Sequence, residues 1–259
     1  MCRLLGWATT TATTLADLLG EADLAGFVEL SAKHGDGWGV AHAEQDTLLV
    51  DKESTAARTS TRFAHRAHAH ASDLALVHLR WATLGLPVVH DNVHPFTNGR
   101  LAFAHNGSIA PPSALEPLLD EQTRLQLRGD TDSERFFLAV LSRLLDSDTP
   151  DPDDDAVGRA YVETVRLIGQ TMACSSLNSM LLTPSRLFAI CSYDPRAEVR
   201  EDEPDYYRLR YRVTPASVVV ASSGFGTGWT DLHNGQLLSV DRRTLAVSVQ
   251  SLDLVPASL

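Results

Sequence analysis

The chain has 259 residues, of which 44% are hydrophobic and 21% are charged, the composition of an ordinary folded protein rather than a disordered one. Its formal net charge of −11 leaves no excess of Lys and Arg to neutralise phosphates, so we expect neither a nucleic acid nor an anionic membrane as a partner. The length permits one domain or two, and we expect a single large domain.

The cysteine content and the N-terminus indicate the setting of the protein. The three cysteines form neither a CxxC motif nor a disulfide pattern, which favours the reducing cytoplasm; they are Cys2, Cys174 and Cys191. No apolar run approaches the roughly 20 residues that span a bilayer. The start of the chain, MCRLLGWATT, lacks the charged and apolar regions of a signal peptide. We therefore expect the N-terminus to be part of the folded protein.

The first half of the chain is predicted to contain mainly strands and turns. Residues 2–8 have the pattern of a strand, and residues 9–35 that of capped helical segments. Glycines in residues 34–53 suggest a turn followed by a hairpin. The apolar runs 74–83 and 100–109 have the character of buried strands.

Helices are predicted in the middle of the chain. Helical periodicity extends over residues 113–127, 132–145 and 156–171. The second of these begins with the sequence TDSE, which has the form of an N-cap followed three residues later by Glu. Residues 146–155, DSDTPDPDDD, form an acidic run broken by proline and are predicted to be a solvated loop.

Strands are predicted again toward the end of the chain. Residues 179–194 have the pattern of a hairpin with its tip at 183–186, and the stretch 196–212, rich in Arg and Tyr, is expected to be an exposed extension. Three further strands are expected within 213–223, 235–243 and 245–255. Strands in both halves, with the helices collected into blocks, favour an α+β layered sandwich over a parallel doubly wound sheet.

Cys2 is the first candidate for a catalytic residue. A thiol attacks a carbonyl as its thiolate and needs a base to remove its proton. An N-terminal cysteine supplies its own base, because a free α-amine has an ordinary pKa of about 7.7 to 8.0. Removal of Met1 is favoured by the small side chain that follows it. Taken alone, however, a cysteine at this position is more often a small buried residue.

Further motifs follow Cys2 in a defined order. They are Cys2-Arg3, HGDGWG (34–39), HLRWATLG (78–85), NVHPF (92–96), AHNGSI (104–109) and GDTDSE (129–134). This series resembles the class II glutamine amidotransferases, the N-terminal-cysteine branch of the N-terminal nucleophile (Ntn) hydrolases. The resemblance implies a four-layer αββα sandwich with mostly antiparallel sheets, formed as one domain by residues 2–259 after loss of Met1. It implies no metal and no organic cofactor.

The resemblance also implies a catalytic group. Cys2 is the nucleophile, and the HNG segment supplies the oxyanion hole through the side-chain amide of Asn106 and the backbone N–H of Gly107. Such donors lower the barrier because a tetrahedral intermediate concentrates negative charge on one oxygen. An isolated Asn-Gly pair is usually a turn. Its place between a predicted strand and the TDSE segment favours the catalytic interpretation.

Four further residues are implied to bind the substrate. Arg80 receives the glutamine α-carboxylate, for which a planar guanidinium is suited. Asp132 receives the α-ammonium, although Asp132 or Thr131 could instead only cap the following helix. Thr83 also contacts glutamine. Trp81 belongs to a lid over the substrate, and a purely structural role in the core is equally compatible with its sequence context.

Several histidines receive no catalytic role. The family segment corresponding to HGDGWG often has arginine before its glycine, whereas this chain has His34. His94 aligns with a family histidine near the lid, but a lone histidine is more often structural. Leu84 replaces the histidine of the sugar-amidating relatives. No convincing metal site is formed by the histidines at 65, 68 and 70.

The expected reaction is hydrolysis of the γ-amide of glutamine, or of a γ-glutamyl compound, through a thioester, which releases glutamate and ammonia or an amine. The ammonia could serve a separate synthase subunit. Alternatively, the chain could act alone. The segments MCR, DGWG and TLG are similar to those of the γ-glutamyl hydrolase of the ergothioneine pathway. The longer segment RWATLG is less like that branch than like the general family.

Two other interpretations were considered. Other N-terminal-cysteine acyl amidases, such as bile-salt and penicillin V hydrolases, would leave the pair Arg80 and Asp132 without a purpose. A non-catalytic glutamine-binding or regulatory subunit would not need an intact Cys2 and HNG segment.

Overall fold

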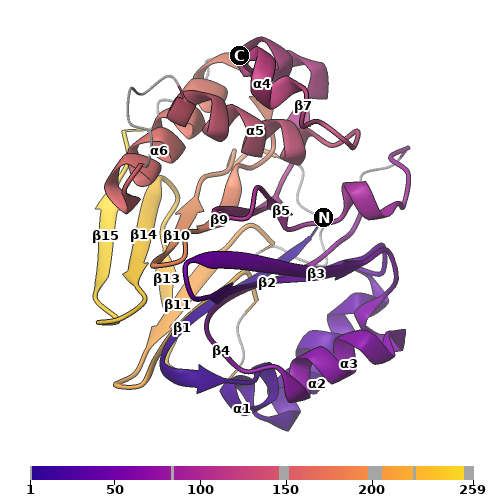
Figure 1. Ribbon diagram of the computed structural model, residues 1–259, viewed down its shortest axis with the longest axis vertical. Coiled ribbons are helices and arrows are strands. Elements are labelled where there is room, and N and C mark those ends of the chain that lie inside the picture. Colours follow the sequence, from indigo (N-terminus) through magenta and orange to yellow (C-terminus); the bar gives the residue numbers. More distant parts are fainter. Residues whose placement is uncertain (1, 83–84, 146–151, 198–205, 224–225, 254–259) are drawn as a thin grey trace.

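Two antiparallel sheets lie face to face in the computed structural model, with helices on both outer sides (Figure 1). The structure describes residues 2–82, 85–145, 152–197, 206–223 and 226–253. The predicted α+β sandwich with four αββα layers is confirmed. The expectation that residues 2–259 form one domain stays a prediction.

The larger sheet has seven strands in the order β13-β11-β12-β1-β4-β2-β3. Strand β1 lies in its interior and pairs with β4 on one side and β12 on the other, so the N-terminus begins in the middle of this sheet. Its strands are β1 (Arg3–Thr13), β2 (Trp38–Glu44), β3 (Thr47–Glu53), β4 (Ser72–Leu79), β11 (Leu209–Val213), β12 (Ser217–Ala221) and β13 (Thr230–Leu232).

The second sheet has six strands in the order β15-β14-β10-β9-β6-β5. They are β5 (Phe96–Thr97), β6 (Ala102–Asn106), β9 (Asn178–Leu182), β10 (Arg186–Cys191), β14 (Gln236–Asp241) and β15 (Val247–Ser251). A separate two-stranded sheet pairs β7 (Ile109–Ala110) with β8 (Ala173–Cys174). The HNG segment thus lies at the end of β6.

The helices form the two outer layers (Figure 1). One layer contains α1 (Leu15–Leu19), α2 (Glu21–Glu29) and α3 (Thr61–Ala69), with the short 3-10 turns η1 (Leu30–Ala32) and η2 (Ala57–Thr59). The other contains η4 (Pro112–Leu118), α4 (Glu121–Arg124), α5 (Asp132–Leu145) and α6 (Asp154–Thr171); a further turn, η3, covers His90–Asn92. None of the helices in the described ranges combines the length and the apolar character needed to cross a bilayer.

Alternation along the strands builds the core between these layers. In β4, Leu74 and Leu76 face the space between the two sheets, while Ala75 and Val77 pack toward the helices. This is the period of two that a strand imposes on its side chains. In β1, a Cβ at Gly6 would lie 3.1 Å from the sulfur of Met180 in the opposite sheet. A glycine there lets the two sheets approach closely.

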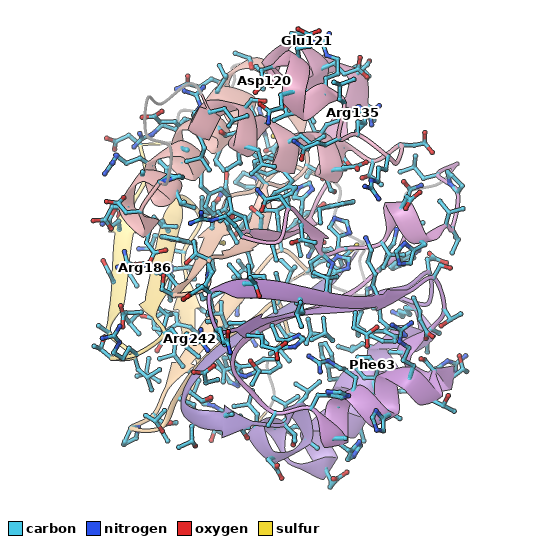
Figure 2. All side chains as sticks on the ribbon, viewed as in Figure 1. Phe63, Asp120, Glu121, Arg135, Arg186 and Arg242 are labelled. Atoms are coloured by element: carbon cyan, nitrogen blue, oxygen red, sulfur yellow. The ribbon has the colours of Figure 1, made fainter. Side chains whose placement is uncertain are left out.

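Ion pairs connect the ends of the two sheets. Arg242, labelled in Figure 2, follows β14. Its guanidinium binds both carboxylate oxygens of Asp73 in β4, at 3.0 and 2.8 Å. It also donates to the Pro184 carbonyl at 2.7 Å. This planar, bidentate contact, together with the bond to Pro184, holds the β9–β10 turn and the end of β14 against the larger sheet.

Two helix predictions were partly wrong. Residues 9–13 continue strand β1, and the helix begins only after Thr14, whose hydroxyl accepts the Asp17 N–H at 3.0 Å. Threonine is β-branched, and its side chain favours the extended conformation of a strand over a helix. The predicted helix 113–127 is divided into η4 and the single turn α4, because Pro117 cannot continue a regular α-helix.

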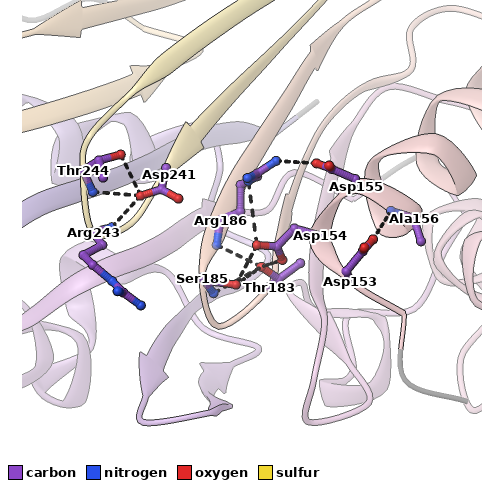
Figure 3. Close-up of polar contacts among 10 residues, drawn as sticks. All are labelled: Asp153, Asp154, Asp155, Ala156, Thr183, Ser185, Arg186, Asp241, Arg243 and Thr244. Carbon is purple, nitrogen blue, oxygen red and sulfur yellow. Dashed lines mark hydrogen bonds and ion pairs between the residues drawn. The ribbon is translucent and has the colours of Figure 1, made fainter.

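The end of the acidic run begins a helix instead of forming the predicted solvated loop. Residues 146–151 lie outside the described part of the chain, but Asp153 accepts the N–H of Ala156 and so caps α6 (Figure 3). Asp154 accepts hydrogen bonds from two hydroxyls of the β9–β10 turn, at 2.6 and 2.7 Å, and Asp155 lies 2.9 Å from Arg186. Asp153 therefore caps the start of helix α6, and Asp154 and Asp155 connect the helix to the second sheet.

The stretch 196–212 was expected to be exposed, and this expectation was wrong for its central residues. Tyr206 and Tyr207 are only 5% and 3% exposed, and β11 begins at Leu209. Residues 198–205 lie outside the described ranges. The polar composition of this stretch led to the prediction of an exposed segment, although the rings of Tyr206 and Tyr207 pack inside the molecule.

Candidate active site

The nitrogen of Cys2 contacts a residue from the opposite sheet. Cys2 immediately precedes β1, and Asn106 ends β6. The Cys2 N–H donates to the Oδ1 of Asn106 at 3.1 Å. In the full chain this nitrogen belongs to the peptide bond after Met1, and removal of Met1 would make it an α-amine. The predicted nucleophile and the predicted oxyanion donor are thus neighbours across the sandwich.

The thiol of Cys2 lies against the backbone of Trp81. Its Sγ accepts the Trp81 N–H at 3.5 Å and lies 3.7 Å from the Trp81 carbonyl, to which the S–H donates. Burial raises the pKa of the Cys2 thiol from its ordinary value, while the Trp81 N–H and the charge of Arg80 act in the opposite direction. The thiol therefore needs a base to become a thiolate.

The other two cysteines have different surroundings. Cys191 is buried between the two sheets, where burial raises the pKa of its thiol to about 12. Burial also raises the pKa of the half-buried Cys174. Within the described residues, no arginine is among the charges that act on either sulfur. Cys2 differs from both in having the positive charge of Arg80 beside its sulfur.

The oxygen and the nitrogen of the Asn106 side-chain amide differ in their hydrogen bonding. Its Oδ1 accepts the Cys2 N–H and lies 3.4 Å from the Tyr206 hydroxyl. Its Nδ2 is buried and, within the described residues, has no hydrogen-bond partner. A buried amide donor without a partner is costly and requires an explanation. A substrate oxyanion would satisfy it.

Gly107 has no room for a side chain. A Cβ there would lie 1.9 Å from the carbonyl oxygen of Ser176 and 2.8 Å from the His105 ring. The ring is fixed in turn, because its two nitrogens contact the Ser133 hydroxyl and the Ser176 carbonyl, each at 2.9 Å. Only glycine allows the backbone after Asn106 to take this path.

Arg80 is a buried residue and not a solvated surface arginine. The residue is 2% exposed, and within the described ranges its guanidinium makes only long contacts, at 3.4 Å, with the carbonyls of Asp36 and Pro87. Its backbone N–H donates to the Gly37 carbonyl at 2.7 Å. The guanidinium lies close enough to affect the Cys2 thiol and retains donor capacity for a carboxylate.

The HGDGWG segment holds the chain around Arg80 and Trp81. Asp36 accepts the Ala82 N–H at 2.8 Å through Oδ2, and its own N–H donates to the Arg80 carbonyl. The ring of His34 meets the ring of the half-buried Trp81 edge to face at 5.4 Å. The sequence motifs predicted no side-chain role in this segment, so the contact of the Asp36 side chain was missed. Thr83 lies outside the described residues.

Asp132 joins the HNG turn to helix α5. Its Oδ2 accepts the Ile109 N–H at 2.7 Å, and its Oδ1 accepts the Ser133 N–H at 2.9 Å. The helix cap comes from its neighbour, because the Thr131 hydroxyl accepts the Glu134 N–H at 3.1 Å. The carboxylate of Asp132 also acts electrostatically on the Cys2 thiol. Its remaining lone pairs could receive an ammonium group.

Two further histidines are buried near the same end of the sandwich. The rings of His78 and His94 lie 4.1 Å apart, and burial lowers the pKa of both well below the ordinary histidine value. Both rings are therefore neutral near pH 7. Within the described ranges, no group of three or more His, Cys, Asp or Glu side chains is arranged to hold a metal ion.

Comparison with known proteins gives the same family along almost the whole chain. Residues 1–251 match the family glutamine amidotransferases class-II. A Saccharomyces cerevisiae protein named as a probable glutamine amidotransferase, DUG3, is 31% identical over 82% of this chain and 71% of its own length. The γ-glutamyl-hercynylcysteine sulfoxide hydrolase of Mycobacterium tuberculosis is 29% identical over 98% of this chain and 97% of its own length.

Solved structures agree in fold. A glutamine aminotransferase class-II domain protein from Silicibacter pomeroyi has a TM-score of 0.65 at 20% identity, over 97% of this chain and 99% of that one. The glutamine phosphoribosylpyrophosphate amidotransferase of B. subtilis has a TM-score of 0.63 at 14% identity, over 98% of this chain but 50% of that one. The chain therefore belongs to the class II glutamine amidotransferases, enzymes that hydrolyse the γ-amide of glutamine or of γ-glutamyl compounds.

Proposed function

We propose that Cys2, exposed as the N-terminal residue by removal of Met1, is the nucleophile of this hydrolysis. The observation that carries the proposal is the contact between the Cys2 nitrogen and Asn106 Oδ1, together with the unpartnered Nδ2 on the other side of the same amide. One asparagine thereby holds the prospective base and offers a donor to the prospective oxyanion.

The first half-reaction forms a thioester. The α-amine takes the thiol proton, the Cys2 sulfur bonds to the γ-carbonyl carbon, and the carbonyl oxygen becomes an oxyanion that Asn106 Nδ2 and the Gly107 N–H stabilise. The intermediate then collapses with cleavage of the C–N bond. The leaving amine receives the proton from the α-ammonium and departs as ammonia or an amine.

The second half-reaction hydrolyses the thioester. The α-amine removes a proton from water, the hydroxide oxygen bonds to the carbonyl carbon, and the same donors hold the second oxyanion. When the C–S bond breaks, the sulfur takes the proton back from the α-ammonium. Glutamate leaves, and the thiol and the amine of Cys2 are restored.

Two buried charges support recognition of a free amino-acid end. Arg80 is positioned to receive the α-carboxylate and Asp132 the α-ammonium, each as a charge-assisted hydrogen bond. Both act electrostatically on the Cys2 thiol, which supports their placement beside the reacting sulfur. Trp81 is assigned to the lid beside the thiol, and Thr83 to a further substrate contact.

For the leaving group, we propose that the chain hydrolyses a γ-glutamyl compound in its own right. Its match to the whole length of the mycobacterial γ-glutamyl-hercynylcysteine sulfoxide hydrolase supports this reading. Delivery of ammonia to a separate synthase subunit is the second candidate, which the match to half of the B. subtilis amidotransferase supports.

Substrate comparison tests the proposed class directly. We expect glutamate release from L-glutamine and from γ-glutamyl amides, and no hydrolysis of a simple acyl amide with the same leaving amine, since the acyl amide lacks both charges that Arg80 and Asp132 would bind. Equal rates on the acyl amide would instead identify a general acyl amidase. Glutamine bound without turnover would identify a regulatory subunit.

Arg80→Ala is expected to weaken substrate capture more than chemistry. Loss of a charge-assisted contact to the α-carboxylate should raise KM at least about tenfold, with a smaller change in kcat. Arg80→Lys, which keeps the charge but loses the planar fork, should fall between the variant and the wild type. Steady-state kinetics with glutamine measures this, with the exposed Arg243→Ala as the control. An unchanged KM in Arg80→Ala would remove Arg80 from the substrate site.

A further inference from the structure

Tyr206 brings a hydroxyl group to the centre of the site. Its oxygen lies 3.1 Å from the carbonyl oxygen of Cys2 and 3.4 Å from Asn106 Oδ1. The hydroxyl proton is thus shared between the backbone of the proposed nucleophile and the side chain of the proposed oxyanion donor. Tyr206 reaches both from the segment that precedes β11, 204 residues after Cys2 and 100 residues after Asn106 in the sequence.

The ring of Tyr206 is held on several sides. The Arg3 guanidinium carbon lies 4.5 Å from its centroid, and the ring of Tyr207 meets it edge to face at 5.2 Å. Tyr207 stacks on Tyr193 at 5.8 Å, and its carbonyl accepts a hydrogen bond of 2.6 Å from the Asn178 amide. The hydroxyl therefore has a fixed position relative to both sheets.

These contacts determine which end of the Asn106 amide faces the substrate. Two donors, the Cys2 nitrogen and the Tyr206 hydroxyl, approach Oδ1. A rotation of the amide by 180° would place the Nδ2 donor against the Cys2 N–H, which is unfavourable because two donors cannot form a hydrogen bond with each other. The Tyr206 hydroxyl, whose single proton lies between the Cys2 carbonyl and Asn106 Oδ1, gives Oδ1 a second donor on this side. Nδ2 is thereby kept on the opposite side, where it is buried and, among the described residues, unpartnered.

We propose that Tyr206 is a positioning residue that holds the Asn106 amide and the Cys2 backbone in the geometry that the reaction requires. The inference rests on the proposed mechanism, since it assigns Tyr206 to the orientation of that mechanism's oxyanion donor. Tyr206 acts through Asn106 and does not touch the reacting carbonyl. Its loss should therefore slow the steps that build an oxyanion and leave other reactions of the thiol unchanged.

Tyr206→Phe is the appropriate variant, because it keeps the ring and its packing and removes only the hydroxyl. With L-glutamine we expect kcat to fall about tenfold and KM to stay within about twofold. Alkylation of Cys2 by iodoacetamide should proceed at the wild-type rate, because displacement at a saturated carbon forms no oxyanion. The matched control is Tyr207→Phe, which removes a neighbouring buried hydroxyl directed at Ser175 and should have wild-type kinetics.

A double-mutant cycle identifies the path of the effect. If Tyr206 acts through Asn106, its hydroxyl should matter little once Asn106 is replaced by Ala. A kcat in Tyr206→Phe within twofold of wild type, a parallel loss of alkylation rate, or full additivity with Asn106→Ala would each overturn the inference. An inactive wild-type protein with Met1 removed would instead refute the proposed mechanism, and this inference with it.

Discussion

Cys2→Ala is expected to lower the rate of γ-amide hydrolysis by at least about 10⁴-fold, because no other group can form the thioester. The fold should be retained, since Ala fits the space of a small buried side chain and the backbone contact to Asn106 Oδ1 remains possible. Glutamate release from glutamine measures the rate, and circular dichroism with denaturant unfolding checks the fold.

Cys174→Ala provides the matched control for the nucleophile. Cys174 is half-buried in β8, and within the described part of the chain the charge that acts on its thiol comes from Asp194, which is not a proposed site residue. We expect this variant to keep wild-type activity and to react with a thiol reagent at Cys2 as before. Residual activity of more than about 1% in Cys2→Ala would place the nucleophile elsewhere, as would loss of activity in Cys174→Ala alone.

Asn106→Ala is expected to reduce kcat by about 10² to 10³-fold with a change in KM of less than about threefold. The reason is that the Nδ2 donor acts on charge that develops only in the transition state. Asn106→Asp should reduce kcat at least as much, because it replaces the donor with a negatively charged oxygen beside the developing oxyanion. Initial rates over a range of glutamine concentrations separate kcat from KM.

The same series can contradict the role of Asn106. If Asn106→Ala kept kcat within fivefold of wild type, the oxyanion would be held by other donors. If the loss appeared in KM alone, the amide would bind the ground state and transition state equally. In either case the unpartnered Nδ2 would need a different explanation.

The layers of this fold follow from local sequence patterns, whereas several of its connections do not. The apolar run 74–83 predicts a buried strand, and the structure has Leu76 and Val77 of β4 packed on opposite faces. Helix α5 begins at the predicted TDSE segment and is capped by Thr131. These features depend on residues close together in the chain. The roles of Asp154 and Asp155 depend on a turn about 30 residues later, which no local pattern contains.

The candidate site divides in the same way. Cys2, Arg80, Asn106 and Asp132 could be identified from the sequence, because each lies within one of the motifs. The structure brings them into one region. Tyr206 was missed because its segment resembles an exposed polar extension, and only packing against Arg3 and Tyr207 buries it. A weak signal was present in two adjacent tyrosines directly before a strand. An aromatic pair at that position indicates a buried segment even where the surrounding residues are polar.

Intact-mass analysis of catalytically active protein, before and after reaction with 6-diazo-5-oxo-norleucine, tests the central claim most directly. The active species should lack the mass of Met1, and a single adduct should appear on the sulfur of Cys2 with loss of activity in proportion. Active protein that retains Met1, or an inactivating adduct on any residue other than Cys2, would contradict it.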